Sequence, residues 1–474
     1  MINKTKIIAT IGPSSNTGPV LEKLIFSGMN VARLNFSHGK YEEHGEVIST
    51  IRSLSREMNR PVAIMLDLQG PKIRTGKLKD GKAVLLKKNN TISITTKKVT
   101  GTADVVSTTY NGLPADVTKG DKILIDDGLM ELQVISINDD TVTCKVINGG
   151  LLKENKGINL PGVNVSTPSL TAKDKKDLNF GIQVGVDYLA LSFVRSADDL
   201  KQIKALIKKK GTDIPVVAKI EKPEAVDNID KILKVADAIM VARGDLGVEM
   251  KPEKVPNIQK HIIHKAIRAN KPVITATQML ETMSINPIPT RAEASDVANA
   301  LFDGTDAIML SGETASGKYP VKAVQMMKRI AAEAEKSEFM KYNLQYEKDS
   351  DELVTHAVAK SAVDILHEVS GKAIIAFSIS GNTSKFISKH RPSMPVYSFT
   401  SSMSVYNRLS LVWGLTPSFI PQINDTKKII EAAERILINK KLIKKDDLVI
   451  IVTGLGLRKG STNIIKVHRV GQKD

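Results

Sequence analysis

Two acidic residues, Glu221 and Asp245, come directly after two successive β-branched apolar runs of the sequence. Carboxylate oxygens suit a hard divalent cation such as Mg²⁺, which keeps several waters and also binds substrate oxygens. Lys219 lies two residues before Glu221, so in a strand both side chains point to one face. A lysine beside a metal can neutralise an enolate or a transferring phosphoryl group without a covalent step. The alternative is that each carboxylate only caps a helix.

Other residues could extend this chemistry. Arg33, Arg74 and Arg243 carry guanidinium forks that suit phosphate oxygens, although a single arginine is more often part of a surface ion pair. The segment 312–318 nearly matches a phosphate-binding P-loop, but Tyr319 stands where a hydroxyl should reach Mg²⁺. We therefore interpret this segment as an ordinary loop, with Pro320 starting a helix.

An architecture must bring these residues together. Short apolar runs alternate with helical patterns, which predicts a parallel sheet, and eight such runs predict a closed (β/α)₈ TIM barrel. A doubly wound open sheet is the alternative. Active sites lie at the carboxyl ends of barrel strands, where the residues named above fall. The runs are 6–11, 30–34, 62–66, 188–191, 216–220, 238–241, 273–276 and 307–310.

The third and fourth runs are too far apart for one helical connection, so the sequence predicts an inserted domain. From Pro71 to about Pro168 the sequence shows short alternating runs with Asp and Asn turn signals, typical of a small all-β domain inserted in a barrel loop. Further runs at 373–377, 395–399 and 448–452 predict a C-terminal α/β domain. We expect the barrel at 1–70 and 167–342, the inserted domain at 71–166 and the C-terminal domain at 343–474.

Composition limits the class of protein. The 474 residues are 42% hydrophobic and 25% charged, as in globular proteins of about three domains. The net charge of +17 raises nucleic acid, membranes or anionic small molecules as partners, but the charge is scattered and aromatics are only 4%. We therefore expect no nucleic-acid or membrane partner. Cys144 is the only cysteine, and the sequence has no signal-like or long apolar segment, so we expect a cytoplasmic enzyme or binding protein.

The chain resembles the pyruvate kinase family from end to end. The resemblance lies in ARLNFSHG at 32–39, LD at 66–67, GP at 70–71, IRTG at 73–76, AKIE at 218–221, VARGDLG at 241–247, ATQMLE at 276–281 and MLSGETA at 309–315. It implies a (β/α)₈ barrel, a small β-barrel lid inserted after the third strand at 71–166, and a C-terminal α/β effector domain, assembled as a homotetramer. It also implies phosphoryl transfer from phosphoenolpyruvate to ADP, giving pyruvate and ATP with Mg²⁺ or Mn²⁺.

The resemblance assigns roles to individual residues. Glu221 and Asp245 match the metal ligands, and Lys219 matches the lysine that stabilises the moving phosphoryl group and the enolate. Arg33 would hold the phosphate. Thr277 would lie where a proton can pass through a water molecule to the enolate carbon. The substrate-binding positions of the family correspond to Arg33, Lys219, Ser192, Arg243, Gly244, Asp245 and Thr277. Asn35, His38, Arg74 and Lys156 match nucleotide-binding positions.

Two departures from the family pattern concern cations and effectors. The monovalent-cation position comprises Asn35, Ser37, Asp67, Leu68 and Lys72. Leu68 replaces a threonine and Lys72 a glutamate, so we expect activity without K⁺. In the effector loop, Ile379 replaces a lysine, and Leu455 and Gly456 replace a Trp-Arg pair.

The expected effector site comprises Ser378, Ser380, Gly381, Asn382 and Thr383. We expect this loop to bind a phosphorylated effector with one phosphate, AMP or a sugar monophosphate, in preference to fructose 1,6-bisphosphate. A metal-dependent pyruvate-type aldolase or lyase on the same barrel is the alternative function.

Overall fold

Eight parallel strands close into a barrel at the centre of the molecule, which confirms the predicted fold class. The computed structural model describes residues 3–340, 353–423, 425–454 and 462–472. Around the barrel the order is β1-β16-β15-β14-β13-β12-β3-β2. The strands are β1 (Lys6–Ile11), β2 (Val31–Asn35), β3 (Ala63–Asp67), β12 (Tyr188–Leu191), β13 (Val216–Ile220), β14 (Ala238–Ala242), β15 (Val273–Ala276) and β16 (Ala307–Leu310).

The barrel strands are covered on both faces, which is why each reads as a continuous apolar run. Every residue of β1, β3, β13 and β14 is buried. Ile8, Met65 and Met240 pack inside the barrel, and Leu411 from the C-terminal region joins this inner cluster. Leu411 lies at the end of the barrel where the strands begin. The nearby Arg408 marks this end, since its carbonyl accepts from the hydroxyl of Tyr188 at the start of β12. The opposite, carboxyl end stays available for a site.

Helices surround the barrel and have sequence-encoded starts. Thr171, Ser196 and Thr290 each cap a helix whose third residue is Asp or Glu, forming capping boxes. Short helical turns follow Leu280 and Ser337. The helices are α1 (Gly18–Ser27), α2 (Tyr41–Glu57), α4 (Ala172–Gln183), α5 (Ala197–Lys209), α6 (Pro223–Asp227), α7 (Ile229–Val235), α8 (Arg243–Glu249), α9 (Val255–Arg268), α10 (Arg291–Phe302), α11 (Gly312–Ala315) and α12 (Pro320–Ala334).

The P-loop-like segment folds as an ordinary connection. It forms the short helix α11 after β16, and α12 begins at Pro320, in agreement with our interpretation.

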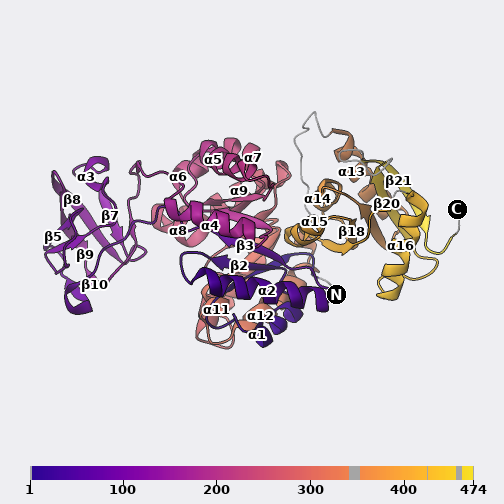
Figure 1. Cartoon of the computed structure of the whole chain (residues 1–474), viewed down its shortest axis with the longest axis horizontal. Coiled ribbons are helices and arrows are strands. Elements are labelled where there is room, and N and C mark those ends of the chain that lie inside the picture. Colours follow the sequence, from indigo (N-terminus) through magenta and orange to yellow (C-terminus); the bar gives the residue numbers. More distant parts are fainter. Residues whose placement is uncertain (1–2, 341–352, 424, 455–461, 473–474) are drawn as a thin grey trace.

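The chain between β3 and β12 folds into a separate part with its own core, at one end of the molecule in Figure 1. It holds a six-stranded sheet of order β11-β7-β8-β9-β5-β6 and a two-stranded sheet of β10 and β4. Strand β9 alternates buried and partly exposed residues, as its sequence predicted. The elements are β4 (Val84–Leu86), β5 (Thr91–Thr95), β6 (Val105–Ser107), α3 (Leu113–Asp116), β7 (Lys122–Ile125), β8 (Met130–Asn138), β9 (Thr141–Asn148), β10 (Gly150–Leu152) and β11 (Ile158–Asn159).

The C-terminal part is an α/β unit on the other side of the barrel (Figure 1). Its sheet has the order β19-β18-β17-β20-β21, with β21 antiparallel. The sequence missed β19 and β21; Pro417 within β19 argues against a strand, and β21 is polar. The expected boundary at residues 342 and 343 lies outside the described residues. The elements are α13 (Leu353–Glu368), β17 (Ala373–Phe377), α14 (Asn382–Lys389), β18 (Val396–Thr400), α15 (Met403–Arg408), β19 (Leu415–Phe419), α16 (Thr426–Asn439), β20 (Leu448–Gly454) and β21 (Thr462–Arg469).

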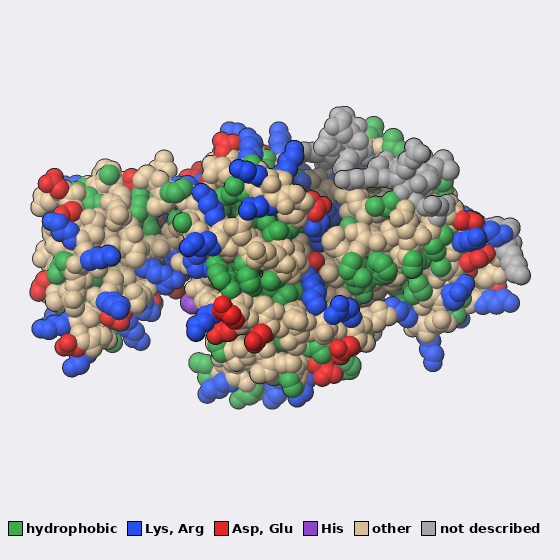
Figure 2. Space-filling view, viewed as in Figure 1, with side chains coloured by type: hydrophobic (Ala, Val, Ile, Leu, Met, Phe, Trp, Pro, Cys, Tyr) green, Lys and Arg blue, Asp and Glu red, His purple; other side chains and the backbone are tan. Residues whose placement is uncertain are grey.

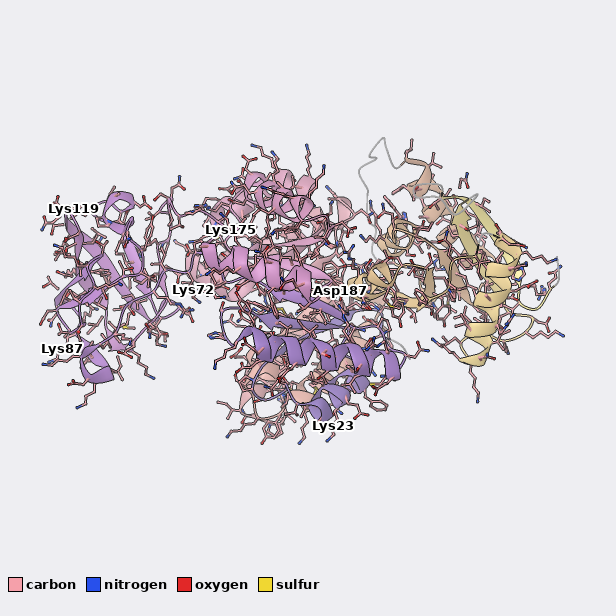
Figure 3. The ribbon with its side chains drawn as sticks, viewed as in Figure 1. Lys23, Lys72, Lys87, Lys119, Lys175 and Asp187 are labelled. Carbon is pink, nitrogen blue, oxygen red and sulfur yellow. The ribbon has the colours of Figure 1, made fainter. Side chains whose placement is uncertain are left out.

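The surplus of positive charge is dispersed. On the face seen in Figure 2, lysine and arginine side chains are scattered over all three parts and interspersed with acidic ones. Lys23, Lys87, Lys119 and Lys175 lie far apart in Figure 3. Within the described ranges, none of the helices is both long and apolar enough to span a membrane.

Candidate active site at the carboxyl end of the barrel

Lys219, near the end of β13, lies at the centre of the site. Its Nζ donates to the Oγ of Ser192 at 2.8 Å and forms ion pairs with Oε1 of Glu221 at 2.8 Å and Oδ1 of Asp67 at 3.3 Å. Burial alone would lower the pKa of Lys219, but Asp67 and Glu221 outweigh burial and raise it. The ammonium group is therefore charged at neutral pH and held in one position.

Asp67, the last residue of β3, holds a second cation. Arg33 on β2 donates from Nε to Oδ2 of Asp67 at 2.7 Å, and its Nη2 lies 2.6 Å from the same oxygen. Burial would raise the pKa of Asp67, but Lys219 and Arg33 lower it. One carboxylate thus fixes an arginine and a lysine side by side, and two adjacent cations suit an anion such as a phosphate.

Glu221 and Asp245 form the acidic part of the site. Oε2 of Glu221 accepts from the backbone N–H of Phe193 at 2.9 Å. Burial raises the pKa of Glu221, Lys219 opposes the rise, and the charge of Asp245 adds to it. Among the described residues no three or more His, Cys, Asp or Glu residues gather as a ready-made metal site. Two carboxylates still fit Mg²⁺, which is often bound through one or two carboxylates plus substrate oxygens.

The turn after β15 is held in an unusual conformation. Thr277 has φ 68°, in the left-handed region that a β-branched residue avoids. Its Oγ1 accepts from the backbone N–H of Gly244 at 2.7 Å, and a Cβ at Gly244 would lie 3.3 Å from that oxygen. We expected Arg243 to extend the positive lining; instead its Nη2 donates to the carbonyls of Thr277 and Gln278 at 2.8 and 3.1 Å, and its Nη1 to Asp296 at 2.8 Å. Its side chain therefore secures the turn.

The expected nucleotide-binding residues lie where the insertion joins the barrel. Burial lowers the pKa of His38, and the charges of Arg74, Lys72 and Arg33 lower it further, so these cations are near the imidazole. Arg74 donates from Nη1 to the carbonyl of Asn155 at 3.3 Å. Asn35, on the same segment as His38, uses its Oδ1 to accept from the N–H of Ser37 at 3.1 Å. Lys156 lies beside Arg74 along the chain fold, because its N–H donates to Oγ1 of Thr75 at 2.9 Å and its carbonyl accepts from the N–H of Thr75 at 2.8 Å. Its Nζ forms an ion pair with Asp126 at 2.7 Å.

At the monovalent-cation position Leu68 follows the buried Asp67, whereas Lys72, within the described residues, forms no ion pair with that carboxylate. Leu68 is only 1% exposed and offers an apolar side chain where an oxygen would be needed. The side chain of Lys72 lies between the insertion and the barrel (Figure 3) and, within the described part of the chain, its Nζ forms no ion pair. Arg33 and Lys219 already neutralise Asp67.

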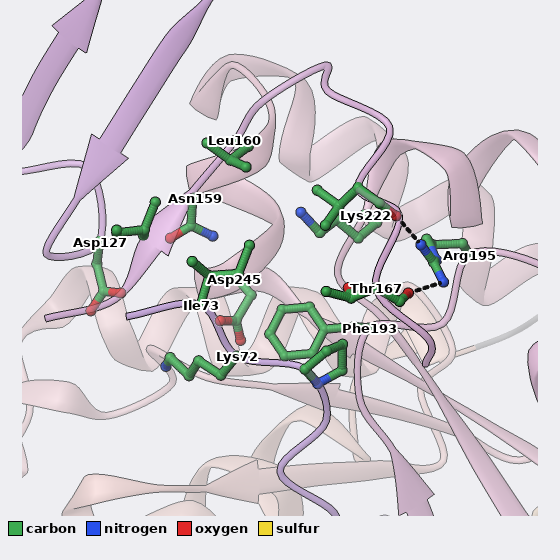
Figure 4. A pocket seen from close by; sticks show the side chains of 13 residues that line it. Lys72, Ile73, Asp127, Asn159, Leu160, Thr167, Phe193, Arg195, Lys222 and Asp245 are labelled. Atoms are coloured by element: carbon green, nitrogen blue, oxygen red, sulfur yellow. Dashed lines mark hydrogen bonds between the residues drawn. The ribbon is translucent and has the colours of Figure 1, made fainter. Parts of the chain in front are cut away.

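A pocket of about 580 Å³ lies between the insertion and the barrel. Figure 4 shows Asn159 and Leu160 from the insertion on one side and Lys222 from the barrel on the other, with Asp245 between them. At its rim, Arg195 donates to the carbonyls of Val165 at 2.6 Å and Thr167 at 2.9 Å, which tethers the segment that leaves the insertion (Figure 4).

Sequence reasoning missed three residues that shape the site. Thr10 accepts from Nη1 of Arg33 at 2.9 Å. Phe193 has φ 55° and orients Glu221 through its N–H. The buried carboxylate of Glu249 forms an ion pair with Lys222. Only Glu249 had a signal, since it lies four residues after Asp245 and so on the same face of a helix.

The expected effector residues surround the start of α14. Gly381 is the N-cap residue of α14 and has φ 83°. The Oγ of the preceding residue, Ser380, accepts from the N–H of Asn382 at 3.5 Å. Thr383 shares a hydrogen bond of 2.5 Å with Thr462. A pocket of about 420 Å³ beside Ser378 is also lined by Ile379, Thr400 and Ser401. Leu455 and Gly456 lie outside the described residues.

A (β/α)₈ barrel whose carboxyl end gathers paired cations and two carboxylates defines a class of enzymes that act on phosphorylated substrates with a metal ion. Family models agree with this class along most of the chain. The model described as pyruvate kinase, barrel domain, matches residues 2–324, and the model described as pyruvate kinase, alpha/beta domain, matches residues 356–468. The chain belongs to the pyruvate kinase family.

Similar proteins support the same assignment. A pyruvate kinase of Geobacillus stearothermophilus is 47% identical over 99% of this chain and 80% of its own length. One of Sporosarcina psychrophila is 46% identical, over 99% and 81%. A crystal structure of a pyruvate kinase from Cryptosporidium parvum matches with a TM-score of 0.91 and 39% identity, covering 99% of this chain and 96% of that one.

Proposed function

We propose that the protein transfers the phosphoryl group of phosphoenolpyruvate to ADP, giving ATP and pyruvate, with Mg²⁺ or Mn²⁺. The observation that carries the proposal is that Arg33 and Lys219 share Asp67, with Lys219 also against Glu221. Phosphoryl transfer needs mainly positioning and charge neutralisation, and this arrangement provides both.

In the proposed reaction, Arg33 and Lys219 hold the phosphate. The bond from phosphorus to the enol oxygen breaks while a bond to a β-phosphate oxygen of ADP forms, and the negative charge left on the enolate oxygen is neutralised by Lys219. A metal ion bound by Glu221 and Asp245 would polarise the phosphate and carboxylate oxygens. Ser192 keeps the Lys219 ammonium in place through its Oγ.

The remaining groups would hold the carboxylate and supply a proton. The backbone at Arg243 and Gly244, with Thr277, would hold the substrate carboxylate. The hydroxyl of Thr277 donates to the carbonyl of Ala276 at 2.6 Å, so it has a fixed orientation. We assign it to a water-linked transfer of the proton that converts the enolate carbon to the methyl group of pyruvate.

The nucleotide side would use Asn35, His38, Arg74 and Lys156. With its pKa lowered, His38 is neutral at pH 7 and can donate or accept a hydrogen bond. Lys156 would exchange its partner Asp126 for a phosphate, which requires only rotation of a long, flexible side chain.

A lactate dehydrogenase-coupled assay tests the reaction. We expect NADH to be consumed only when phosphoenolpyruvate, ADP and the divalent metal are all present. Pyruvate release without ADP would instead support the aldolase or lyase alternative.

Activity without K⁺ is a further part of the proposal. The buried side chain of Leu68 and the cations already on Asp67 support it. In Tris buffer free of Na⁺ and K⁺, we expect the kcat to stay within about twofold of its value with K⁺. A strict requirement for K⁺ would refute this part.

The effector site is proposed for AMP or a sugar monophosphate at Ser378, Ser380, Gly381, Asn382 and Thr383. The N–H groups at the start of α14 support it, since such groups favour anions. Each effector is titrated against the phosphoenolpyruvate saturation curve. If neither effector shifts the curve, the proposed effector site is ruled out.

We also propose a cytoplasmic homotetramer divided at 1–70 and 167–342, 71–166 and 343–474. The family likeness supports this assembly and division, and the single cysteine supports a reducing compartment. Size-exclusion chromatography with light scattering is expected to give four times the chain mass of 51.6 kDa.

A further inference from the structure

A contact between the insertion and the barrel converges on Glu249, the last residue of α8. Its Oε1 lies 2.6 Å from Nζ of Lys222 and accepts from Nδ2 of Asn159 at 2.8 Å. Lys222 follows β13, whereas Asn159 belongs to β11 of the insertion. In Figure 4 the side chains of Asn159 and Lys222 reach toward each other from opposite sides of the pocket.

Glu249 needs both partners for different reasons. Its side chain is 2% exposed, and a buried carboxylate is tolerated when it is paired with a cation and fully hydrogen-bonded. Lys222 supplies the charge and Asn159 supplies a further hydrogen bond. Replacing Lys222 would leave a buried charge unpaired, whereas replacing Asn159 removes only the contact with the insertion.

This hydrogen bond is isolated. Within the ranges that the structure describes, it is the only hydrogen bond between side chains that joins the insertion strands β4–β11 to the barrel. The turn between β7 and β8 also approaches α8, since a Cβ at Gly128 would lie 3.9 Å from Cγ1 of Val248. Arg195 holds the segment that leaves the insertion, but the contact of the insertion strands with α8 is small, and a single substitution can remove its one side-chain hydrogen bond.

The elements that meet at Glu249 carry the proposed reaction groups. Helix α8 also bears Asp245, four residues earlier and so on the same helical face. Lys222 follows Glu221 directly, and Asn159 lies three residues after Lys156 in the insertion. A displacement of Asn159 therefore moves Lys156 relative to both proposed metal ligands.

We infer that Asn159 is a positioning residue, which through Glu249 sets the insertion at the distance from α8 at which Lys156 and Arg74 meet the nucleotide. The inference rests on the proposed function for its kinetic consequence, but the position of the insertion can be measured without any reaction. It predicts an effect on ADP rather than on phosphoenolpyruvate, because Arg33 and Lys219 belong to the barrel.

The kinetic test uses Asn159→Ala with Asn138→Ala as the matched control, an exposed asparagine on β8 remote from Glu249. We expect Asn159→Ala to raise the KM for ADP about tenfold, the scale of one hydrogen bond to a charged group, with the KM for phosphoenolpyruvate within about twofold. The exchange of Asn159→Asp with Glu249→Gln restores an amide and a carboxylate, and should bring the KM for ADP back to within about threefold. If the double variant has as high a KM for ADP as Asn159→Ala, the inference is overturned.

The structural test measures the distance between spin labels at Lys119→Cys in the insertion and Lys23→Cys in the barrel (Figure 3). The native Cys144 stays unlabelled, because it is buried and burial raises the pKa of its thiol to about 12. We expect a broader distance distribution for Asn159→Ala than for the parent. If the distribution is unchanged, the inference fails, whether or not the proposed reaction is correct.

Discussion

Asp67 is the residue on which the proposed site depends most. Because it ends β3, its carboxylate can face both Arg33 on the neighbouring strand β2 and Lys219 across the barrel mouth. Without it, Lys219 would keep Glu221, but the largely buried Arg33 would lose its carboxylate partner, at a cost of several kcal/mol. A phosphate that enters therefore finds cations that are already oriented, and no large rearrangement is needed at the moment of reaction.

The clearest prediction at the residue scale concerns Lys219. Lys219→Met should lower the kcat about a thousandfold or more, because the charge on the enolate loses its nearest cation. Arg33 and the carboxylate-binding groups remain, so calorimetry should show phosphoenolpyruvate binding within a few-fold of the parent. Lys23→Met, on the exposed face of α1, serves as the control for loss of a lysine. Near-normal turnover of Lys219→Met would contradict the assigned role.

A second residue-scale prediction concerns the monovalent cation. The double variant Leu68→Thr with Lys72→Glu supplies an oxygen and a negative charge in place of an apolar and a positive side chain. It should be stimulated at least about fivefold by K⁺, since hard cations bind where oxygen donors and negative charge combine. The parent should respond less than twofold in the same titration. Equal responses would mean that these two positions do not decide K⁺ dependence.

At the scale of elements, the strand ends could be predicted and the turns after them could not. Alternating apolar runs place Glu221, Asp245 and Lys219 at one end of a barrel, because parallel strands share that end. The role of the Arg243 side chain is different: it depends on the left-handed conformation of Thr277, which no local pattern shows. The contact between Asn159 and Glu249 likewise joins residues ninety positions apart.

The turn after β15 gives a prediction for an element. Arg243→Met removes the donors that hold the carbonyls of Thr277 and Gln278, so the disfavoured φ of Thr277, a strain of about 1–3 kcal/mol, is free to relax. We expect the KM for phosphoenolpyruvate to rise about tenfold while the KM for ADP stays within about twofold. Arg291→Met, an exposed arginine on α10, should change neither. An unchanged KM for phosphoenolpyruvate would show that the turn keeps its conformation without Arg243.

At the scale of the whole molecule, the C-terminal part is joined to the barrel by buried polar contacts. Lys6 at the start of β1 is 3% exposed and donates to the carbonyl of Leu415 at 2.6 Å. Burial lowers the pKa of Lys6 to about 8, although Glu335 opposes the shift. The sequence predicted both parts but not this junction, because a lysine inside a strand gives no sign of which part covers it.

The junction predicts a pH dependence of stability. The pKa of Lys6 is about 8 in the folded protein and about 10.4 in an unfolded chain, so between these values the unfolded state binds more protons. The free energy of unfolding of the parent, relative to Lys6→Met, should therefore rise by up to about 1.4 kcal/mol per pH unit from pH 8 to pH 10. Denaturant unfolding of both proteins across this range measures the difference. A constant difference would mean that Lys6 is not the titrating group.

The central claim is transfer of a phosphoryl group between two small molecules at one barrel mouth. A ³¹P NMR time course with phosphoenolpyruvate, ADP and Mg²⁺ tests it most directly. We expect the phosphoenolpyruvate resonance to fall as the γ-phosphate resonance of ATP rises by the same amount, with no inorganic phosphate formed. Loss of phosphoenolpyruvate to inorganic phosphate, or no loss at all, would contradict it.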